Sequence, residues 1–71
     1  MVWLHKKISL NIKIERIKKK LSQEQLSELA NLSKNTIGNI ERGEVSPTIA
    51  TLEKIANALG IKFTDLVNVD D

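Results

Sequence analysis

Residues 23–43, QEQLSELANLSKNTIGNIERG, decide the fold of this chain, because they contain two short helical patterns separated by one tight turn. Ser22 and Gln25 form the pair S-x-x-Q, which is typical of a capping box, so the first helix is predicted to begin at Gln23. Its apolar face consists of Leu26, Leu29 and Ala30.

The turn between the two helices is predicted at Asn31. Asparagine is the non-glycine residue that most readily adopts the left-handed backbone conformation such a turn requires. Ser33 is then expected to cap the second helix. Ile37 and Ile40 form the buried face of that helix, and Gly43 is predicted to end it.

The segment after Gly43 predicts a loop and two further helices. Pro47 closes the loop, and Thr48 is expected to cap a helix that ends at Gly60. The apolar residues of this helix follow a spacing of three and four: Ile49, Leu52, Ile55, Ala56 and Leu59. A last helical turn is expected over residues 63–67, and the polar, acidic tail 68–71 is expected to fray.

The segment before Leu21 fits two patterns. Alternation of apolar and polar residues over residues 8–14 matches a strand, whereas Ile14, Ile17 and Leu21 follow the helical period. We predict a helix from about residue 9 to 19, because the lysine run at 18–20 suits a helix end. Residues 1–7 either extend this helix or form a short extended arm.

Composition indicates one all-helical domain over residues 1–71, with a core at about 8–67, an arm at 1–7 and an acidic tail at 68–71. The chain is 41% hydrophobic and 28% charged, which is typical of a globular protein. No apolar run is long enough to span a membrane and no secretion signal is recognisable, so a cytoplasmic protein is expected. Five helices joined by short loops predict a compact bundle.

Charge is distributed unevenly along the chain. Residues 6–20 contain seven basic side chains and one acidic side chain, whereas residues 21–71 contain four basic and eight acidic ones. A basic N-terminal third favours an anionic partner, although a solvated helix face would explain the same charges.

Enzymatic functions find no support in the sequence. There is no glycine-rich phosphate loop and no nucleophile with a histidine partner. With no cysteine and a single histidine, the chain has no metal-ligand cluster either. We therefore expect neither an enzyme nor a bound cofactor or metal.

Several linked motifs resemble the phage-repressor and Cro-like (XRE-type) helix-turn-helix family. Residues 21–26 match its L-[ST]-Q-x-x-L start, Ser27 stands where the family has a small residue, and Asn31 stands at a turn that usually has glycine. Residues 36–43 match T-I-x-x-I-E-x-G, Pro47-Thr48 match P-[ST], and residues 52–61 match L-x-K-I-A-x-A-L-G-[VI]. The resemblance covers roughly residues 8–67 and implies a compact five-helix, lambda-repressor-like DNA-binding domain.

In such a fold the second helix of the pair enters the major groove of DNA by its N-terminal residues. Its exposed face is predicted to carry Gly38 among polar side chains that suit base edges. The candidates for base contacts are Lys34, Asn35, Thr36 and Asn39. The family pattern implies contacts to the DNA backbone by Gln23, Ser33, Arg42, Ser46, Thr48 and Lys20. A solvated helix face without a partner is the alternative.

Three features need separate treatment: one glycine, one turn residue and one possible ion pair. Gly38 indicates either a close approach of the backbone to DNA or sequence drift at a solvent-facing site. Lys20 stands where the family has glycine or asparagine, so that turn is either strained or different. The resemblance implies that Arg16 in the first helix pairs with Glu41 near the end of the recognition helix, and two unrelated surface charges are the alternative.

The resemblance implies a sequence-specific regulator of transcription that binds double-stranded DNA, most simply a repressor acting as a homodimer on a palindromic operator. The dimer surface is expected at the C-terminal turn (Phe63, Leu66, Val67), with the segment containing Trp3 as the alternative. Other functions stay open: a controller or antitoxin-type autoregulator of a restriction-modification or toxin operon, a protein-interaction module, or an RNA-binding adaptor. No small-molecule ligand is expected, so regulation would depend on concentration, degradation or a protein partner.

Overall fold

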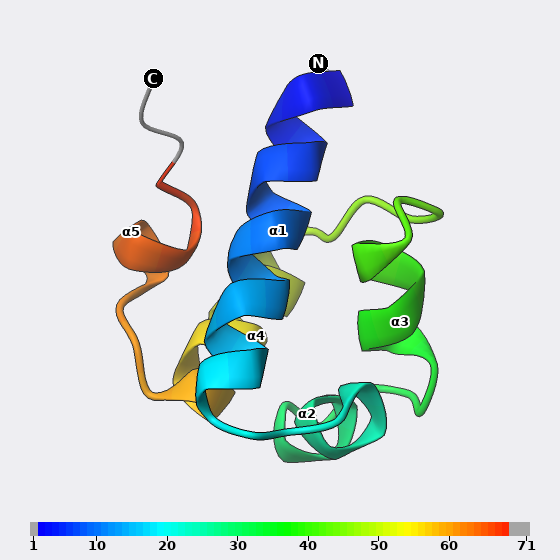
Figure 1. Cartoon of the computed structure of the whole chain (residues 1–71), viewed down its shortest axis with the longest axis vertical. Coiled ribbons are helices and arrows are strands. Elements are labelled where there is room, and N and C mark those ends of the chain that lie inside the picture. The colour runs from blue at the N-terminus through cyan, green and yellow to red at the C-terminus, as the bar shows by residue number, and fades with distance from the viewer. Residues whose placement is uncertain (1, 69–71) are drawn as a thin grey trace.

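The computed structural model describes residues 2–68, with side chains from residue 6 onward. It is all-helical over this range (Figure 1). The elements are α1 (Val2–Lys18), α2 (Gln23–Leu29), α3 (Thr36–Glu41), α4 (Ile49–Leu59) and α5 (Phe63–Leu66). The predicted five-helix, all-α fold is confirmed. The expected fraying of the acidic tail concerns residues that lie almost entirely outside the described range.

Helix α1 is longer than the sequence pattern predicted. It begins at Val2 rather than near residue 9, so residues 2–7 extend the helix and do not form an extended arm. The strand-like alternation has a simple origin, because Ile12 is fully buried whereas Leu10 and Ile14 on the other side of the helix are exposed. Apolar residues on two faces of one helix imitate the period of a strand.

The core lies where α1 crosses the other helices. Helix α1 contacts α3, α4 and α5, while α2 contacts α3 and α4. In Figure 1, α1 lies in front of α4, with α3 and α5 on either side and α2 at the base. The largest fully buried apolar side chains come from all five helices: Ile12, Leu26, Ile37, Ile40, Ile55, Leu59 and Leu66. This arrangement places α2 and α3 side by side at one edge of the bundle.

The first four helices end in the same way. In each case one residue adopts a left-handed conformation, and the next N–H group donates to the carbonyl five residues earlier, which is the hydrogen bond of a Schellman motif. Those donors and acceptors are Leu21 to Arg16, Leu32 to Ser27, Glu44 to Asn39 and Ile61 to Ala56. The left-handed residues are Lys20, Asn31, Gly43 and Gly60. The predicted helix ends at Asn31, Gly43 and Gly60 are therefore confirmed.

Lys20 holds a conformation that favours glycine, with φ 58°. A residue other than glycine pays about 1–2 kcal/mol for this left-handed conformation. Replacing it with glycine removes that cost, but part of the gain in stability is lost because glycine makes the unfolded chain more flexible. We expect Lys20→Gly to raise the free energy of unfolding by about 0.5–1 kcal/mol, which corresponds to a few degrees in Tm. Thermal unfolding followed by circular dichroism measures the change.

Lys19→Gly is the matched control, because it removes the same charge from the same turn at a residue without positive φ. It is expected to lower the Tm. Equal effects of the two changes would contradict the assignment of strain to Lys20.

Candidate nucleic-acid interface

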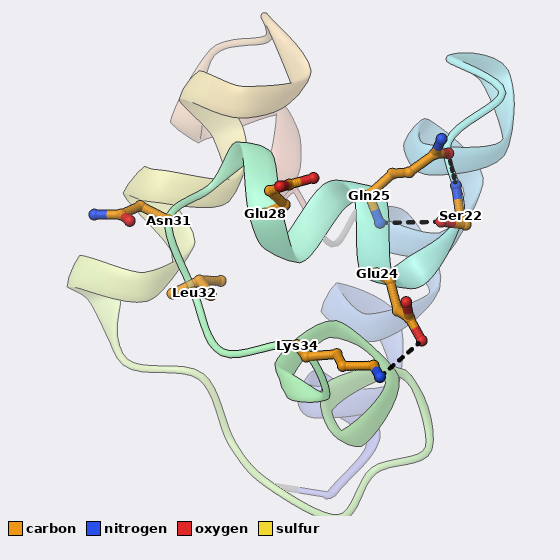
Figure 2. Close-up of a pocket in the computed structure, with 7 residues that line it drawn as sticks. All are labelled: Ser22, Glu24, Gln25, Glu28, Asn31, Leu32 and Lys34. Carbon is orange, nitrogen blue, oxygen red and sulfur yellow. Dashed lines mark hydrogen bonds and ion pairs between the residues drawn. The ribbon is translucent and has the colours of Figure 1, made fainter.

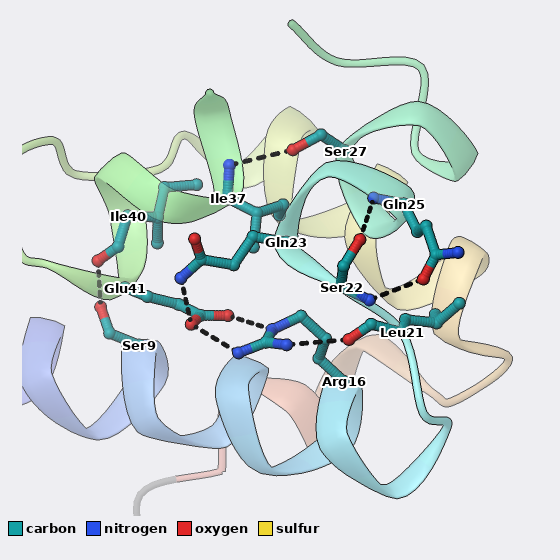
Figure 3. Close-up of polar contacts among 10 residues, drawn as sticks. All are labelled: Ser9, Arg16, Leu21, Ser22, Gln23, Gln25, Ser27, Ile37, Ile40 and Glu41. Atoms are coloured by element: carbon teal, nitrogen blue, oxygen red, sulfur yellow. Dashed lines mark hydrogen bonds and ion pairs between the residues drawn. The ribbon is translucent and has the colours of Figure 1, made fainter. Parts of the chain in front are cut away.

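Helix α3 contains only six residues, and other helices hold it in place (Figure 3). Its apolar side chains Ile37 and Ile40 are buried in the core. At its start, the N–H group of Ile37 donates to the hydroxyl of Ser27 on α2 over 3.2 Å. At its end, the hydroxyl of Ser9 on α1 donates to the carbonyl of Ile40 over 2.9 Å. Both ends of the helix are therefore fixed from outside.

The predicted cap at Ser33 is wrong. Helix α3 begins at Thr36, and Asn35 occupies the N-cap position without a side-chain hydrogen bond. The carbonyl of Ser33 instead accepts from the N–H group of Thr36 over 3.0 Å, which closes a turn over residues 33–36. The local cap is dispensable here because Ser27, from the neighbouring helix, accepts from an N–H group in the first turn of α3. By contrast, the caps predicted at Ser22 and Thr48 are confirmed.

An ion pair joins α1 to the end of α3. The Nε and Nη2 atoms of Arg16 donate to the two carboxylate oxygens of Glu41 over 2.8 and 3.1 Å. The Arg16 side chain is 12% exposed and the Glu41 side chain 5%. A third bond runs from Nη1 of Arg16 to the carbonyl of Leu21 over 2.8 Å. These two residues are thus not unrelated surface charges, and the pair fixes α3 against the scaffold.

Gln23, the first residue of α2, belongs to the same cluster. Its Nε2 atom donates to Oε1 of Glu41 over 3.0 Å, and the residue is half-buried. A carboxylate that accepts three charge-assisted or amide hydrogen bonds in a partly buried site is held in one geometry. The cluster of Arg16, Glu41 and Gln23 therefore ties α1, α2 and α3 together at one place.

Gly38 is buried, and it is not on the exposed face that the sequence predicted. A Cβ atom at this position would lie 3.0 Å from Nη1 of Arg42 and 3.0 Å from Oε1 of Gln23. The position is thus not solvent-facing, and the explanation by drift at such a site is wrong. Glycine leaves room there for the side chains of Gln23 and Arg42, which both pack against this position.

The candidate base contacts lie at the start of α3 and in the turn before it. Lys34 and Asn35 are exposed in that turn, Thr36 is the first helical residue, and Asn39 lies one turn further along and is half-buried. The Oδ1 atom of Asn39 accepts a hydrogen bond from Nη2 of Arg42. The structure thus places all four candidates within α3 or directly before it.

Lys34 also faces a shallow depression along α2 (Figure 2). Its Nζ atom lies 3.9 Å from Oε2 of Glu24, and both side chains are well exposed. Glu28 lines the same depression. Two carboxylates beside one lysine do not favour an anionic ligand in this depression, and an exposed pair of this kind contributes little to stability.

The candidate backbone contacts are more dispersed. Lys20 and Ser33 are exposed in the turns before α2 and α3, and Arg42, Ser46 and Thr48 are exposed at or after the end of α3. Thr48 and Arg42 are among those that already have internal partners. The hydroxyl of Thr48 caps α4, and Nε of Arg42 lies 3.3 Å from Oε2 of Glu44.

The C-terminal residues expected at a dimer surface pack mainly inward. Leu66 is fully buried, and Phe63 and Val67 are partly buried against the core. The side chain of Asn11 on α1 donates to the carbonyl of Leu66 over 2.9 Å, which holds α5 in place. The side chain of Trp3 lies outside the described residues. Leu66 therefore has no side-chain surface to offer a partner in this conformation.

Sequence reasoning missed the roles of two serines that hold α3. Ser27 was recognised only as a small residue, although its hydroxyl is also the acceptor for α3. Ser9 carried no signal, because a serine in a helix between apolar residues has no pattern that reveals a partner 31 residues away.

A helix pair joined by a tight turn, with a short second helix that two neighbouring helices fix and polar side chains at its start, is typical of the class of helix-turn-helix DNA-binding domains. The model of the helix-turn-helix family HTH_3 matches residues 12–66, and the chain belongs to this family. The resemblance to XRE-type proteins is thereby confirmed. Membership in a family of DNA-binding regulators agrees with the expectation that the chain is not an enzyme.

Similar proteins include phage and restriction-modification regulators. The immunity repressor protein of Bacillus phage phi105 is 43% identical over 60 residues, which cover 84% of this chain and 42% of the repressor. The control protein C.SmaI of Serratia marcescens is 39% identical over 57 residues, which cover 80% of this chain and 68% of that protein. The crystal structure of the restriction-modification controller protein C.Esp1396I matches with a TM-score of 0.86 and 33% identity, covering 94% of this chain and 90% of the controller. The chain thus spans less than half the length of the phage repressor.

No helix among residues 2–68 combines the length and the apolar character that crossing a membrane requires. Within the same range, no group of three or more His, Cys, Asp or Glu side chains is placed to hold a metal ion.

Proposed function

We propose that this chain is a sequence-specific regulator of transcription that binds double-stranded DNA, and that it represses as a homodimer on a palindromic operator in the cytoplasm. The observation that carries the proposal is the fixed recognition segment. Residues 34–39 present polar side chains at the start of a short helix, while the cluster of Arg16, Glu41 and Gln23 holds the other end of that helix. Side chains that form hydrogen bonds with base edges must be held in a fixed geometry, and this arrangement provides it.

The chemistry of the segment suits the major groove. Lys34 can donate to guanine O6 or N7, and the amide groups of Asn35 and Asn39 can form bidentate hydrogen bonds with adenine. The methyl group of Thr36 can contact the methyl group of thymine. The bond from Arg42 to Oδ1 of Asn39 orients that amide and leaves its NH₂ group available for adenine N7.

Contacts to phosphates would position the domain on the duplex. We assign them to candidates at the starts of α2 and α3 and between α3 and α4, which are Lys20, Gln23, Ser33, Arg42, Ser46 and Thr48. Gln23 can take this role although Glu41 accepts one of its amide hydrogens, because the second hydrogen of the NH₂ group can still be donated to a phosphate oxygen.

An autoregulatory controller of a restriction-modification operon is the second candidate. It is favoured by the similarity to C.SmaI and C.Esp1396I, the latter matched over 90% of its chain. The DNA contacts would be the same, and a two-fold dimer would again place half-sites about one helical turn apart. An antitoxin role, a protein-interaction module and an RNA-binding adaptor lack a comparable observation.

Selection of bound duplexes from a random pool tests the proposal directly. A recovered palindrome would report the target and the dimer together. Affinity for that duplex is expected to fall steeply with salt, with a slope of about −0.9 for each phosphate contact on logarithmic axes. A flat salt dependence, or no preference for any duplex after selection, would exclude the regulator function.

Asn39→Ala separates base reading from phosphate binding. Loss of a bidentate pair to adenine is expected to reduce discrimination at one base position by roughly 1–3 kcal/mol, or about 5- to 150-fold. Lys20→Gln is the comparison variant, because loss of a phosphate contact should weaken all duplexes alike and reduce the salt slope by about 0.9. Binding to the operator and to single-base variants measures both effects. Uniform weakening by Asn39→Ala would show that Asn39 does not read a base.

A further inference from the structure

Helix α1 carries a second apolar face that the core does not use. Its inner face is buried through Ile12, whereas Leu10, Ile14 and Ile17 are 51%, 42% and 55% exposed on the opposite side. Three large aliphatic side chains that share one side of a helix form a continuous apolar stripe. The stripe therefore lies on the side of α1 opposite Ile12, the residue through which the helix packs into the core.

The spacing of the stripe is that of a helix–helix seam. Residues 10, 14 and 17 are separated by four and then three positions, which corresponds to successive d, a and d positions of a heptad. A stripe confined to a and d positions is narrow, whereas a helix that lies on a membrane surface has a broad apolar face. The geometry therefore favours another helix as the occupant over a lipid surface.

Basic side chains border the seam on both sides. In the same register Lys6 and Lys13 occupy g positions and Lys18 occupies an e position, and all three are exposed. On one side, Lys6 and Lys13 line a groove that also contains Arg42 and Glu41, and the charge of Glu41 is compensated by Arg16. On the other side, Glu15 lies 3.3 Å from Lys18 and compensates only that charge. The borders of the seam are thus predominantly positive.

A second copy of this chain does not suit such borders. A parallel pair would bring Lys13 of one helix against Lys18 of the other, and an antiparallel pair would bring Lys6 against Lys13. Like charges facing each other across a seam oppose association. Acidic side chains at the same positions of a partner would instead form ion pairs on both sides of the apolar seam.

We propose that the outer face of α1 is a docking surface for an acidic amphipathic helix of another protein, which has aliphatic residues at a and d and carboxylates at e and g. The aliphatic side chains cover Leu10, Ile14 and Ile17, and the carboxylates pair with the bordering lysines. This inference does not rest on DNA binding, because neither the stripe nor its borders belong to the recognition segment.

A synthetic peptide of three heptads, with Ile and Leu at a and d and Glu at e and g, is the probe. Binding to the folded chain is measured by fluorescence anisotropy with a labelled peptide. The acidic peptide is expected to bind, whereas a version with Lys at e and g and a scrambled acidic version of the same composition should not. Equal binding of the basic peptide, or no binding of the acidic one, would overturn the proposal.

Two sets of variants locate the site. Ile14→Gln is expected to weaken binding about tenfold or more, because it removes one aliphatic side chain from the seam. Ile49→Gln, which changes an isoleucine on α4 that is 67% exposed, compared with 42% for Ile14, should leave binding unchanged. The double variant Lys6→Glu and Lys13→Glu should prefer the basic peptide. Because all these side chains are exposed, the circular dichroism spectrum should stay that of the parent chain.

Two further measurements would reveal a different occupant of this face. Sedimentation that shows a dimer lost on Ile14→Gln would assign the face to a second copy. Tighter binding to phosphatidylglycerol vesicles than to the acidic peptide, with the same dependence on Ile14 and Lys13, would assign it to an anionic membrane. Either result would overturn the proposal.

Discussion

Replacing Glu41 with glutamine is expected to lower the free energy of unfolding by about 3 kcal/mol, and thus the Tm by roughly 12–24 °C. The change leaves the guanidinium of Arg16 only 12% exposed and without its carboxylate. It also places an amide NH₂ group against donors, because Arg16 and Gln23 both donate to Glu41. Thermal unfolding by circular dichroism measures the loss.

Glu44→Gln is the matched control. Glu44 also lies near an arginine, 3.3 Å from Arg42, but both side chains are more than half exposed. Its removal is expected to change stability by less than about 1 kcal/mol. A Tm of Glu41→Gln that matches the parent chain would show that the pair with Arg16 is not structural.

The double variant Arg16→Met and Glu41→Met tests the mechanism of the loss. Breaking a buried pair is costly mainly because one charge stays behind without a partner. Removing both charges should therefore recover part of the stability lost in either single variant. A double variant as unstable as the sum of the two single ones would instead assign the loss to side-chain packing.

Replacing Ser27 with valine is the second change with a large expected effect, a loss of about 2–5 kcal/mol. Ser27 is fully buried where α2 and α3 meet, and its hydroxyl accepts from the N–H group of Ile37 over 3.2 Å. Valine removes that acceptor and adds a larger side chain at a fully buried position, where it crowds the neighbouring atoms. We expect a lower midpoint in urea unfolding and weaker binding to DNA, because α3 must shift.

Ser27→Ala separates the two causes. It removes only the hydroxyl, so it leaves the N–H group of Ile37 without its partner at a cost of about 1–3 kcal/mol. The further loss in Ser27→Val measures the crowding. Ser33→Val, at an exposed serine six residues away, should have little effect on stability. Equal stability of Ser27→Val and the parent chain would contradict the tight packing of α2 on α3.

Much of the fold could be predicted from local patterns. The capping box of Ser22 and Gln25 marked the start of α2, and Gly43 and Gly60 marked the ends of α3 and α4. These signals work because a cap or a left-handed residue acts on the backbone within a few positions. The approach of Arg16 to Glu41, 25 residues apart, was available only through the family resemblance.

Two of the three predictions that failed depend on contacts between helices. The start of α3 was misplaced because its acceptor, Ser27, lies on α2. The burial of Gly38 could not be predicted because one of the two side chains that cover it, Gln23, comes from α2, whereas Arg42 belongs to the end of α3 itself. The start of α1 was missed because its apolar outer face obscured the helical period. A window of neighbouring residues around α3 contains neither Ser27 nor Gln23 as a recognisable partner.

The external anchoring of α3 separates what the domain recognises from what keeps it folded. Ser9, Arg16 and Ser27 fix the helix through Ile37, Ile40 and Glu41, whereas positions 34, 35 and 39 are not among these anchors. New side chains can therefore be exchanged at those three positions at little cost in stability. Under the proposed function, mutation at these positions would change the preferred DNA sequence while the fold is retained.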